Sequence, residues 1–184
     1  MQDDRELIGR AKEYDPAAFA QIYERYYQGI YNYVYYRVGD PSLAEDLVAD
    51  VFLKVMEGIE SFTFRGVPFS AWLYRIANNL VIDYFRRQPR QPELALEEGQ
   101  LAVEGGPVEA LERSLTQEEL ARALRGLTED QRQVIILKFV DGLSNTEVAQ
   151  ILGKTEGAIK SLQHRALASL SRILGEVGRD AAAF

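Results

Sequence analysis

The sequence predicts an all-α fold of two small helical domains joined by an acidic flexible linker, with a helix-turn-helix in the C-terminal domain. Apolar residues recur at three- and four-residue steps along most of the chain, as in amphipathic helices. No alternating strand pattern competes with this spacing. Prolines, glycines and glutamates interrupt it midway. We therefore expect domains at residues 1–88 and 111–184, with a linker at residues 89–110.

Three helices are expected in the first domain. They are predicted at residues 16–38, 41–58 and 69–87. Gly39 supplies a C-terminal stop for the first of them, and Asp40 and Pro41 supply an N-cap and a first helical position for the second. A turn-rich break at residues 61–68 separates the second helix from the third.

The second domain carries the pattern of a helix-turn-helix. A short helix at residues 144–152 is followed by a tight turn at Gly153-Lys154 and a longer helix from Thr155 to about Ile173. Capping boxes mark two helix starts, at Thr128-Glu129-Asp130-Gln131 and at Ser144-Asn145-Thr146-Glu147. Apolar residues of the two helices would pack together and leave a polar and basic face open.

That open face suits duplex DNA. Its residues are Thr155, Glu156, Lys160, Ser161, Gln163, His164 and Arg165. Short polar side chains stand at the start of the helix, where they can reach base edges, and basic side chains follow, where they can hold phosphates. The alternative is an ordinary helical hairpin with a solvated basic face.

Charge is unevenly distributed along the 184 residues. The net charge is −7, with −2 in residues 1–92, −6 in residues 93–112 and +1 in residues 113–184. Basic residues cluster late in each outer block, at residues 75–90 and 150–172. Because the local field acts on a phosphate backbone, two basic patches separated by an acidic strip remain compatible with nucleic-acid binding.

Several classes of protein are disfavoured. The chain has no cysteine, and its one histidine, His164, is isolated, so we expect no disulfide, no metal site and no cofactor. No nucleophile–base pair or phosphate-binding glycine loop stands out, so we expect no enzyme. Apolar runs are far shorter than the roughly 20 residues that cross a bilayer, and the N-terminus lacks a secretory signal. These features predict a cytoplasmic protein without membrane insertion.

Two segments of the first domain carry candidate binding chemistry. Asp46 and Asp50 lie four residues apart on one side of their helix, which indicates either an acidic docking patch or simple solubility. The segment at residues 62–69 and the helix after it mix aromatic, amide and arginine side chains. Such side chains suit unstacked single-stranded bases, although aromatic residues at helical spacing can equally form core.

Four segments resemble the extracytoplasmic-function sigma factors of bacterial RNA polymerase. Residues 46–55 resemble the family's core-polymerase-binding helix, and residues 69–87 resemble its promoter-melting and minus-ten-reading segment. Residues 127–143 and 144–170 are similar to its minus-thirty-five-reading domain. The resemblance covers residues 16–88 and 111–174 in the family's order.

The resemblance implies three sets of binding residues. Those for the clamp of core polymerase are Asp46, Asp50, Phe52 and Lys54. Those for the single-stranded minus-ten element are Phe64, Arg65, Trp72, Arg75, Asn78, Asn79, Arg86 and Arg87. Those for the duplex minus-thirty-five element are Thr155, Glu156, Lys160, Ser161, His164 and Arg165.

The resemblance also implies partners and shows departures. It implies binding to the clamp and flap of core RNA polymerase, to duplex and single-stranded promoter DNA, and to an anti-sigma factor. Ala49 stands where the family often has glutamine, and Leu162 stands where it often has arginine in the recognition helix.

Two other functions fit part of the pattern. A transcriptional regulator would use the helix-turn-helix to bind duplex DNA without polymerase, and a helical protein-interaction adaptor would have basic faces that are merely solvated. Regulators of this kind usually carry an α/β receiver, and residues 1–90 show no alternating strand pattern.

Overall fold

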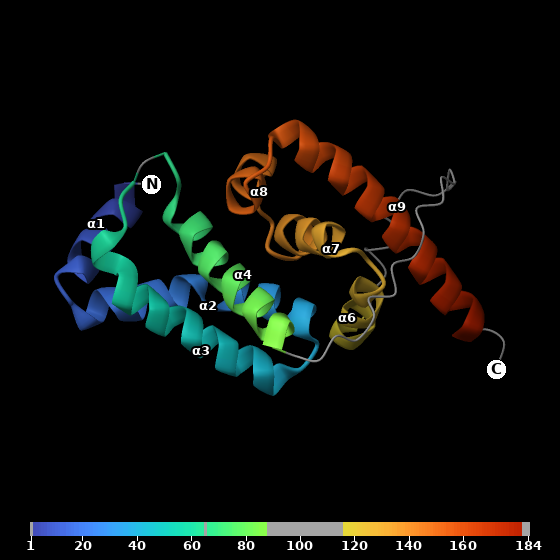
Figure 1. Ribbon diagram of the computed structural model, residues 1–184, viewed down its shortest axis with the longest axis horizontal. Coiled ribbons are helices and arrows are strands. Elements are labelled where there is room, and N and C mark those ends of the chain that lie inside the picture. The colour runs from blue at the N-terminus through green and yellow to red at the C-terminus, as the bar shows by residue number, and fades with distance from the viewer. Residues whose placement is uncertain (1, 65, 88–115, 182–184) are drawn as a thin grey trace.

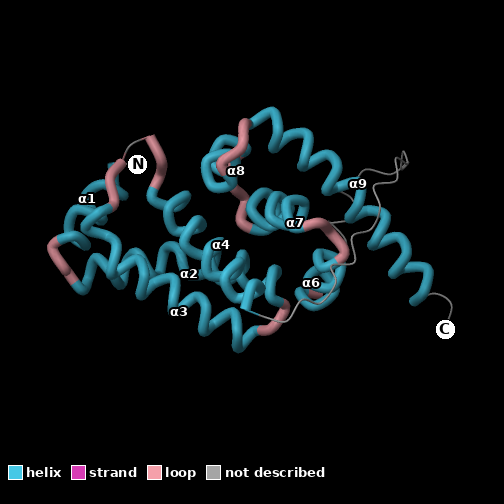
Figure 2. Tube along the Cα trace, in the orientation of Figure 1, coloured by secondary structure: helices cyan, strands magenta, loops and turns pink. Residues whose placement is uncertain are grey.

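The structure is a computed structural model that describes residues 2–64, 66–87 and 116–181. The described residues form helices and connecting turns, without a strand (Figures 1 and 2). The helices are α1 (Gln2–Lys12), α2 (Pro16–Val38), α3 (Pro41–Gly58), the 3-10 turn η1 (Ile59–Ser61), α4 (Phe69–Arg87), α6 (Gln117–Arg125), α7 (Glu129–Ile135), the π-helical turn η2 (Ile136–Val140), α8 (Asn145–Leu152) and α9 (Glu156–Ala181). The all-α prediction is confirmed, and the predicted linker at residues 89–110 lies outside the described residues.

Helices α1 to α4 form an N-terminal unit in which α2, α3 and α4 pack against one another. The turn between α2 and α3 follows the predicted local chemistry. Gly39 has a φ of 75°, a left-handed conformation that ends α2. Asp40 caps α3 by accepting a hydrogen bond of 2.9 Å from the backbone nitrogen of Leu43, and Pro41 occupies the first helical position.

Helix α1 was not expected from the sequence. Apart from glycine, its apolar residues are Leu7, Ile8 and Ala11, so the periodic signal is short. Leu7, Ile8 and Ala11 are nevertheless buried, and α1 packs against α2 and η1. This helix therefore owes its place to tertiary contacts rather than to a long apolar stripe.

Helices α6 to α9 form a C-terminal unit with well-defined helix starts. The predicted capping boxes at Thr128 and Ser144 are both present, with reciprocal bonds to Gln131 and Glu147. Gly153 ends α8 with a φ of 65°, and α9 begins after a short turn. The helix-turn-helix prediction is thus confirmed in its geometry.

The centre of this unit is the apolar run from Val134 to Leu137, in which all four residues are fully buried. A helix with four successive buried residues must be covered on every side. Helix α9 covers one side and α2 of the other unit covers another. The run also contains the start of η2, a π-helical turn that the sequence did not predict.

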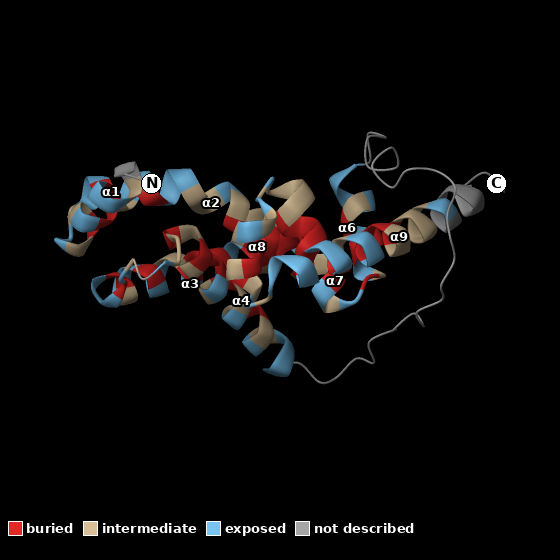
Figure 3. Ribbon diagram, turned by 90° about the horizontal axis from the view of Figure 1, so that it is seen from above, coloured by how far each residue is buried: buried red, intermediate tan, exposed pale blue. Residues whose placement is uncertain are grey.

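The two units pack directly together. Helix α4 contacts α8, and α2 contacts α6, α7 and η2. One hydrophobic cluster includes buried residues of both units, and Figure 3 shows buried segments continuing through the middle of the molecule. This packing determines which of the candidate binding residues face solvent.

Candidate nucleic-acid interface

The outer face of α3 combines acidic and apolar side chains. Asp46, Asp50 and Lys54 are exposed, as a docking surface requires. Phe52 is half-buried because its ring packs on Tyr23 of α2, with the ring centroids 4.8 Å apart. The face also includes Leu53, Met56 and Ala49, of which Leu53 is 55% exposed and Met56 is 48% exposed. This face therefore offers a protein partner both acidic and apolar groups, and its role in docking stays a prediction.

The segment before α4 is built around an aromatic cluster. Phe62 is buried and packs edge-on against Phe64 and Phe69, with centroids 4.9 Å and 5.3 Å apart. Trp72 is half-buried and packs 5.1 Å from Phe62. Phe64 and Trp72 therefore stabilise the segment and also keep part of their rings accessible. Arg65 lies outside the described residues.

Helix α1 holds this segment in place. Lys12 Nζ donates a hydrogen bond to the carbonyl oxygen of Phe62. The Arg5 guanidinium lies over the ring of Phe64, 5.4 Å from its centroid. Tyr14, just past the end of α1, donates a hydrogen bond of 2.7 Å to Glu60. The aromatic segment is thus anchored by a helix that the sequence analysis did not consider.

Four of the predicted minus-ten residues are exposed on α4, namely Arg75, Asn79, Arg86 and Arg87. Arg86, beside Arg87, makes a long ion pair of 3.6 Å with Asp83. The two arginines stand in the last turn of the helix, where a cation also interacts favourably with the helix dipole. This end of α4 is a basic surface that anionic DNA can reach.

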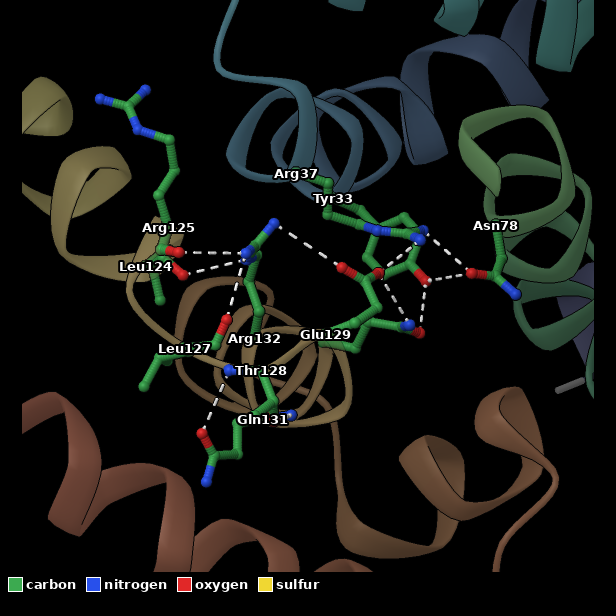
Figure 4. A network of polar contacts seen from close by, with 11 residues as sticks. Tyr33, Arg37, Asn78, Leu124, Arg125, Leu127, Thr128, Glu129, Gln131 and Arg132 are labelled. Carbon is green, nitrogen blue, oxygen red and sulfur yellow. Dashed lines mark hydrogen bonds and ion pairs between the residues drawn. The ribbon is translucent and has the colours of Figure 1, made fainter. Parts of the chain in front are cut away.

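Two predicted residues of α4 are hydrogen-bonded within the chain, Arg75 to the C-terminal unit and Asn78 to α2. Arg75 Nη2 donates a hydrogen bond of 2.7 Å to the carbonyl oxygen of Gln150 in α8. The Oδ1 of Asn78 accepts hydrogen bonds from Arg37 at 2.9 Å and from Tyr33 at 3.4 Å. Figure 4 shows Asn78 pointing toward these two α2 side chains.

Arg37 is the centre of this polar network. Its side chain is 1% exposed, and it pairs with Glu129 of α7 at 2.5 Å. Glu129 also accepts from Gln133 at 3.0 Å, and Gln133 accepts from the Tyr33 hydroxyl at 2.9 Å (Figure 4). Burial raises the pKa of Tyr33, so its hydroxyl stays protonated and donates. Residues of both units thus complete one buried network.

Asp141, at the end of η2, forms a second polar contact between the units. Its carboxylate accepts hydrogen bonds from Tyr74 of α4 at 2.9 Å and from Asn32 of α2 at 3.2 Å. Burial raises the pKa of Asp141 to about 7, although both hydrogen bonds act in the opposite direction. The neighbouring Tyr74 has a raised pKa because of burial and, next, Asp141, with smaller contributions from Tyr33 and Glu147.

Asp141→Asn is expected to change how stability depends on pH. Wild-type Asp141 is protonated in the folded protein up to about pH 7 but ionised in the unfolded chain above about pH 4. The unfolding free energy of wild type therefore falls as pH rises from about 4 to about 7, because the unfolded chain releases the Asp141 proton and the folded chain keeps it. The fall is on the order of a few kcal/mol. The asparagine of the variant has no proton to release in this range, so the variant should not show this fall. Urea unfolding of both proteins at pH 5 and pH 8 should show the variant gaining relative to wild type at pH 8; an equal difference at both pH values would contradict the prediction.

The helix-turn-helix presents the predicted duplex-reading residues on one face. Ile159, Leu162 and Ala166 are buried and pack α9 onto the unit. The predicted residues Thr155, Glu156, Lys160, Ser161, His164 and Arg165 are all exposed. Leu162, where the family often has arginine, is buried in this chain and so does not belong to the exposed face of α9.

The first two residues of this set also have structural roles. Thr155 Oγ1 accepts a hydrogen bond of 3.2 Å from the backbone nitrogen of Ala158, which caps α9. Glu156 accepts a hydrogen bond of 2.9 Å from Thr146, which links α9 to α8. Both residues therefore help to set the angle at which the exposed face of α9 is presented.

Two structural absences apply to the described ranges. Within residues 2–64, 66–87 and 116–181, no group of histidine, cysteine and acidic side chains could hold a metal ion. Among the helices of the same part of the chain, none is long and apolar enough to span a bilayer.

The sequence analysis missed Arg37, Glu129 and Asp141, which organise the contact between the units. One signal was available for Arg37. It stands seven residues after Ile30 and three after Val34, on the buried stripe of its helix, where an arginine needs a partner. Glu129 and Asp141 had no such signal, because both follow ordinary capping or turn patterns.

These features together define a class. The C-terminal unit contains a helix-turn-helix with an open polar and basic face. The N-terminal unit joins an aromatic segment to exposed arginines. Together they have the features of a helical DNA-binding transcription protein. Sigma-70 region 2 matches residues 22–91, and Sigma-70, region 4 matches residues 117–170. Both regions come from the sigma factors of RNA polymerase.

The relatives are sigma factors of one group. The ECF RNA polymerase sigma factor BldN of Streptomyces coelicolor is 40% identical over 176 residues, which are 95% of this chain and 67% of BldN. The ECF RNA polymerase sigma factor SigW of Bacillus subtilis is 33% identical, over 94% of this chain and 97% of SigW. This chain therefore belongs to the ECF family of RNA polymerase sigma factors.

Two solved structures resemble the whole arrangement. CnrH, solved in complex with the cytosolic domain of CnrY, superposes on 94% of this chain and 97% of its own with a TM-score of 0.73 and 26% identity. The sigma factor RpoE of Bartonella quintana, solved in complex with the anti-sigma factor NepR, superposes on 85% of this chain and 96% of its own with a TM-score of 0.66 and 28% identity.

Proposed function

We propose that this sigma factor binds core polymerase, the minus-ten element and the minus-thirty-five element through three separate surfaces. The outer face of α3, with Asp46, Asp50, Phe52 and Lys54, binds the clamp of core RNA polymerase. Exposed carboxylates beside the exposed apolar Leu53 support this assignment, since such a surface suits a partner with both basic and apolar groups.

The aromatic segment and α4 take the single-stranded minus-ten element in this proposal. Phe64 and Trp72 offer stacking surfaces, and Arg86 and Arg87 offer phosphate contacts. The face of α9 that carries Lys160 takes the duplex minus-thirty-five element. Capture of bases exposed by local opening stabilises melted DNA relative to duplex. The polymerase, and not this chain, performs the phosphodiester chemistry.

The proposal assigns residues 1–88 to the domain for polymerase and the minus-ten element and residues 111–184 to the domain for the minus-thirty-five element. Residues 89–110 connect them. We further propose that the chain works in the cytoplasm and has an anti-sigma partner. The superposition on RpoE of Bartonella quintana, whose structure contains the anti-sigma factor NepR, supports the existence of such a partner.

The observation that carries the proposal is the joint match of both helical units to sigma regions in one chain. Run-off transcription from a pooled promoter library tests it, using purified core polymerase with and without the protein. Protein-dependent transcripts with a shared pair of upstream elements are expected. If no new transcript forms and core polymerase is not retained in a low-salt pull-down, the proposal is wrong.

Lys160→Gln is expected to weaken binding to duplex DNA. Loss of one phosphate contact should reduce affinity about 5- to 10-fold and lower the slope of log K against log salt by about one. Fluorescence anisotropy with the mapped upstream element, over a salt series, measures both. Arg122→Gln on exposed α6 removes the same charge outside the helix-turn-helix and should bind as wild type. An equal loss in both variants would show that only net charge matters.

A further inference from the structure

A cavity lies between α1 and the aromatic segment before α4. Its volume is about 310 Å³, and it is lined by Arg5, Ile8, Gly9, Lys12 and Phe64. This volume is at the lower end of the range for small-molecule sites, about 300 to 1,000 Å³, so the cavity has room for one small group. Helix α1 packs against α2 and η1, and in Figure 1 it lies at the opposite end of the molecule from α6 and α9. The cavity is therefore accessible in this arrangement.

One stripe of α1 forms most of the lining. Arg5, Ile8, Gly9 and Lys12 follow the spacing i, i+3, i+4, i+7, which places them on one face of the helix. The middle of this stripe is hollow because Gly9 has no side chain, and a Cβ at this position would meet no heavy atom within 4 Å. The two basic residues stand at the ends of the stripe, about 10 Å apart along the helix axis.

The lining favours an anion that carries a planar ring. Of the five described residues that line the cavity, two are cations and none is a carboxylate. Lys12 Nζ uses one of its three donors on the carbonyl oxygen of Phe62, so two donors remain for a ligand. The Arg5 guanidinium lies 5.4 Å from the centroid of the Phe64 ring, and bases stack both on aromatic rings and on guanidinium planes. A nucleotide supplies the phosphate and the base that these groups suit.

A nucleotide within a strand fits the cavity better than a free nucleotide. Such a nucleotide has a phosphate on each side of its base, and the cavity has a cation at each end of the hollow at Gly9. A free nucleotide carries its phosphates on one side only and would leave one cation unused. Helix α1 also precedes residues 22–91, which match Sigma-70 region 2, whereas Phe64 lies within them. The cavity thus joins a helix outside that match to the aromatic segment inside it.

We propose that this cavity, the α1 pocket, binds one nucleotide of a single DNA strand. Arg5 and Lys12 contact the two phosphates, and the base lies over Gly9 against the Arg5–Phe64 pair. The α1 pocket thus extends the strand-binding surface from the aromatic segment and α4 onto α1. Its place in promoter binding rests on the proposed function, but its affinity for a strand can be measured without polymerase and without a promoter.

Gly9→Met is the first test variant. The methionine side chain fills the hollow without changing the net charge. Methionine is also a better helix former than glycine, so α1 should not be weakened. Affinity for a single strand should fall at least about 5-fold, because the base loses its stacking surface, and the slope of log K against log salt should stay as in wild type. Gly175→Met, at an exposed position of α9 with equally open space, is the matched control and should bind as wild type.

Arg5→Gln is the second test variant. Arg5 is exposed, so the fold should tolerate the change. Affinity should fall about 5- to 10-fold, and the salt slope should decrease by about 0.7, which is the value for one phosphate contact on a single strand. Arg122→Gln on exposed α6 removes the same charge far from the α1 pocket and should change neither quantity.

Fluorescence anisotropy of the full chain over a salt series measures both quantities, with a labelled random-sequence single strand of about 12 nucleotides as the probe. Circular dichroism checks that each variant keeps its helices. Unlabelled deoxynucleoside monophosphates separate the two sources of nucleotide, and they should displace the strand only weakly. No binding by wild type at low salt, equal binding by Gly9→Met and wild type, or full displacement by monophosphates at the nucleotide concentration of the strand would each overturn the proposal. Failure of the run-off assay would sink the proposed function and leave this result to decide the α1 pocket, because the random probe carries no promoter sequence.

Discussion

The double variant Asp46→Lys, Asp50→Lys is expected to lose binding to core polymerase and, with it, promoter-dependent transcription. Both carboxylates are exposed on the outer face of α3, which the proposed function assigns to the polymerase clamp. On that proposal, the charge reversal replaces two attractive contacts with two repulsive ones. Loss of a close charge pair at an interface costs about 2 to 5 kcal/mol, so affinity should fall at least about 100-fold. Pull-down with purified core polymerase and run-off transcription measure the two effects.

The fold should tolerate this change. The pair of like charges four residues apart is replaced by another pair of like charges, so repulsion along α3 is nearly the same. The unfolding free energy should change by less than about 0.5 kcal/mol, as for other exposed positions. The matched control is Glu6→Lys, Glu13→Lys, which changes net charge equally at two exposed positions, one in α1 and one just after it. If the control also loses core polymerase, the net charge and not the α3 face determines binding.

Leu73→Ala is expected to cause the largest loss of stability. Leu73 lies in the second turn of α4 with 0% exposure, at the core of the N-terminal unit. Removal of a fully buried leucine side chain leaves a cavity and costs about 2 to 5 kcal/mol. Since a domain of this kind is stable by only about 5 to 15 kcal/mol in total, a large part of the population should unfold on mild heating.

Urea unfolding followed by circular dichroism measures this effect, with Leu53→Ala as the control. Leu53 is the same residue type in a neighbouring helix but is 55% exposed, so its truncation should change the unfolding free energy by less than about 0.5 kcal/mol. Similar losses for the two variants would mean that helix propensity, rather than burial, sets the cost. A loss below 1 kcal/mol for Leu73→Ala would contradict the packing described for α4.

Much of the fold was determined locally and could be predicted from the sequence. The end of α2 at Gly39, the start of α3 at Asp40 and the capping boxes at Thr128 and Ser144 depend on side chains within a few residues of the backbone groups that they satisfy. For the same reason, helical spacing predicted the exposed face of α9 that carries Lys160.

The candidate site was predicted less completely. Spacing placed Asn79, Arg86 and Arg87 on α4 and their exposure agrees with a binding role, which stays a prediction. Spacing could not show that Arg75 is hydrogen-bonded to α8 of the C-terminal unit, or that Asn78 is hydrogen-bonded to Arg37 of α2. It also could not show that α1 anchors the aromatic segment, since the contact between Lys12 and Phe62 joins residues far apart in the chain.

The sequence by itself determined helices α2, α3, α4, α8 and α9, the predicted caps and the exposed face of α9, because these depend on the period of the helix and on short-range hydrogen bonds. Only the tertiary structure decided that the two units close on each other, that Arg37 pairs with Glu129 and that Asp141 is buried against Tyr74. Tyr74 and Asp141 are 67 positions apart in the chain, and Arg37 and Glu129 are 92 positions apart. No local pattern selects one distant partner over another, because the choice depends on how two complete surfaces fit together.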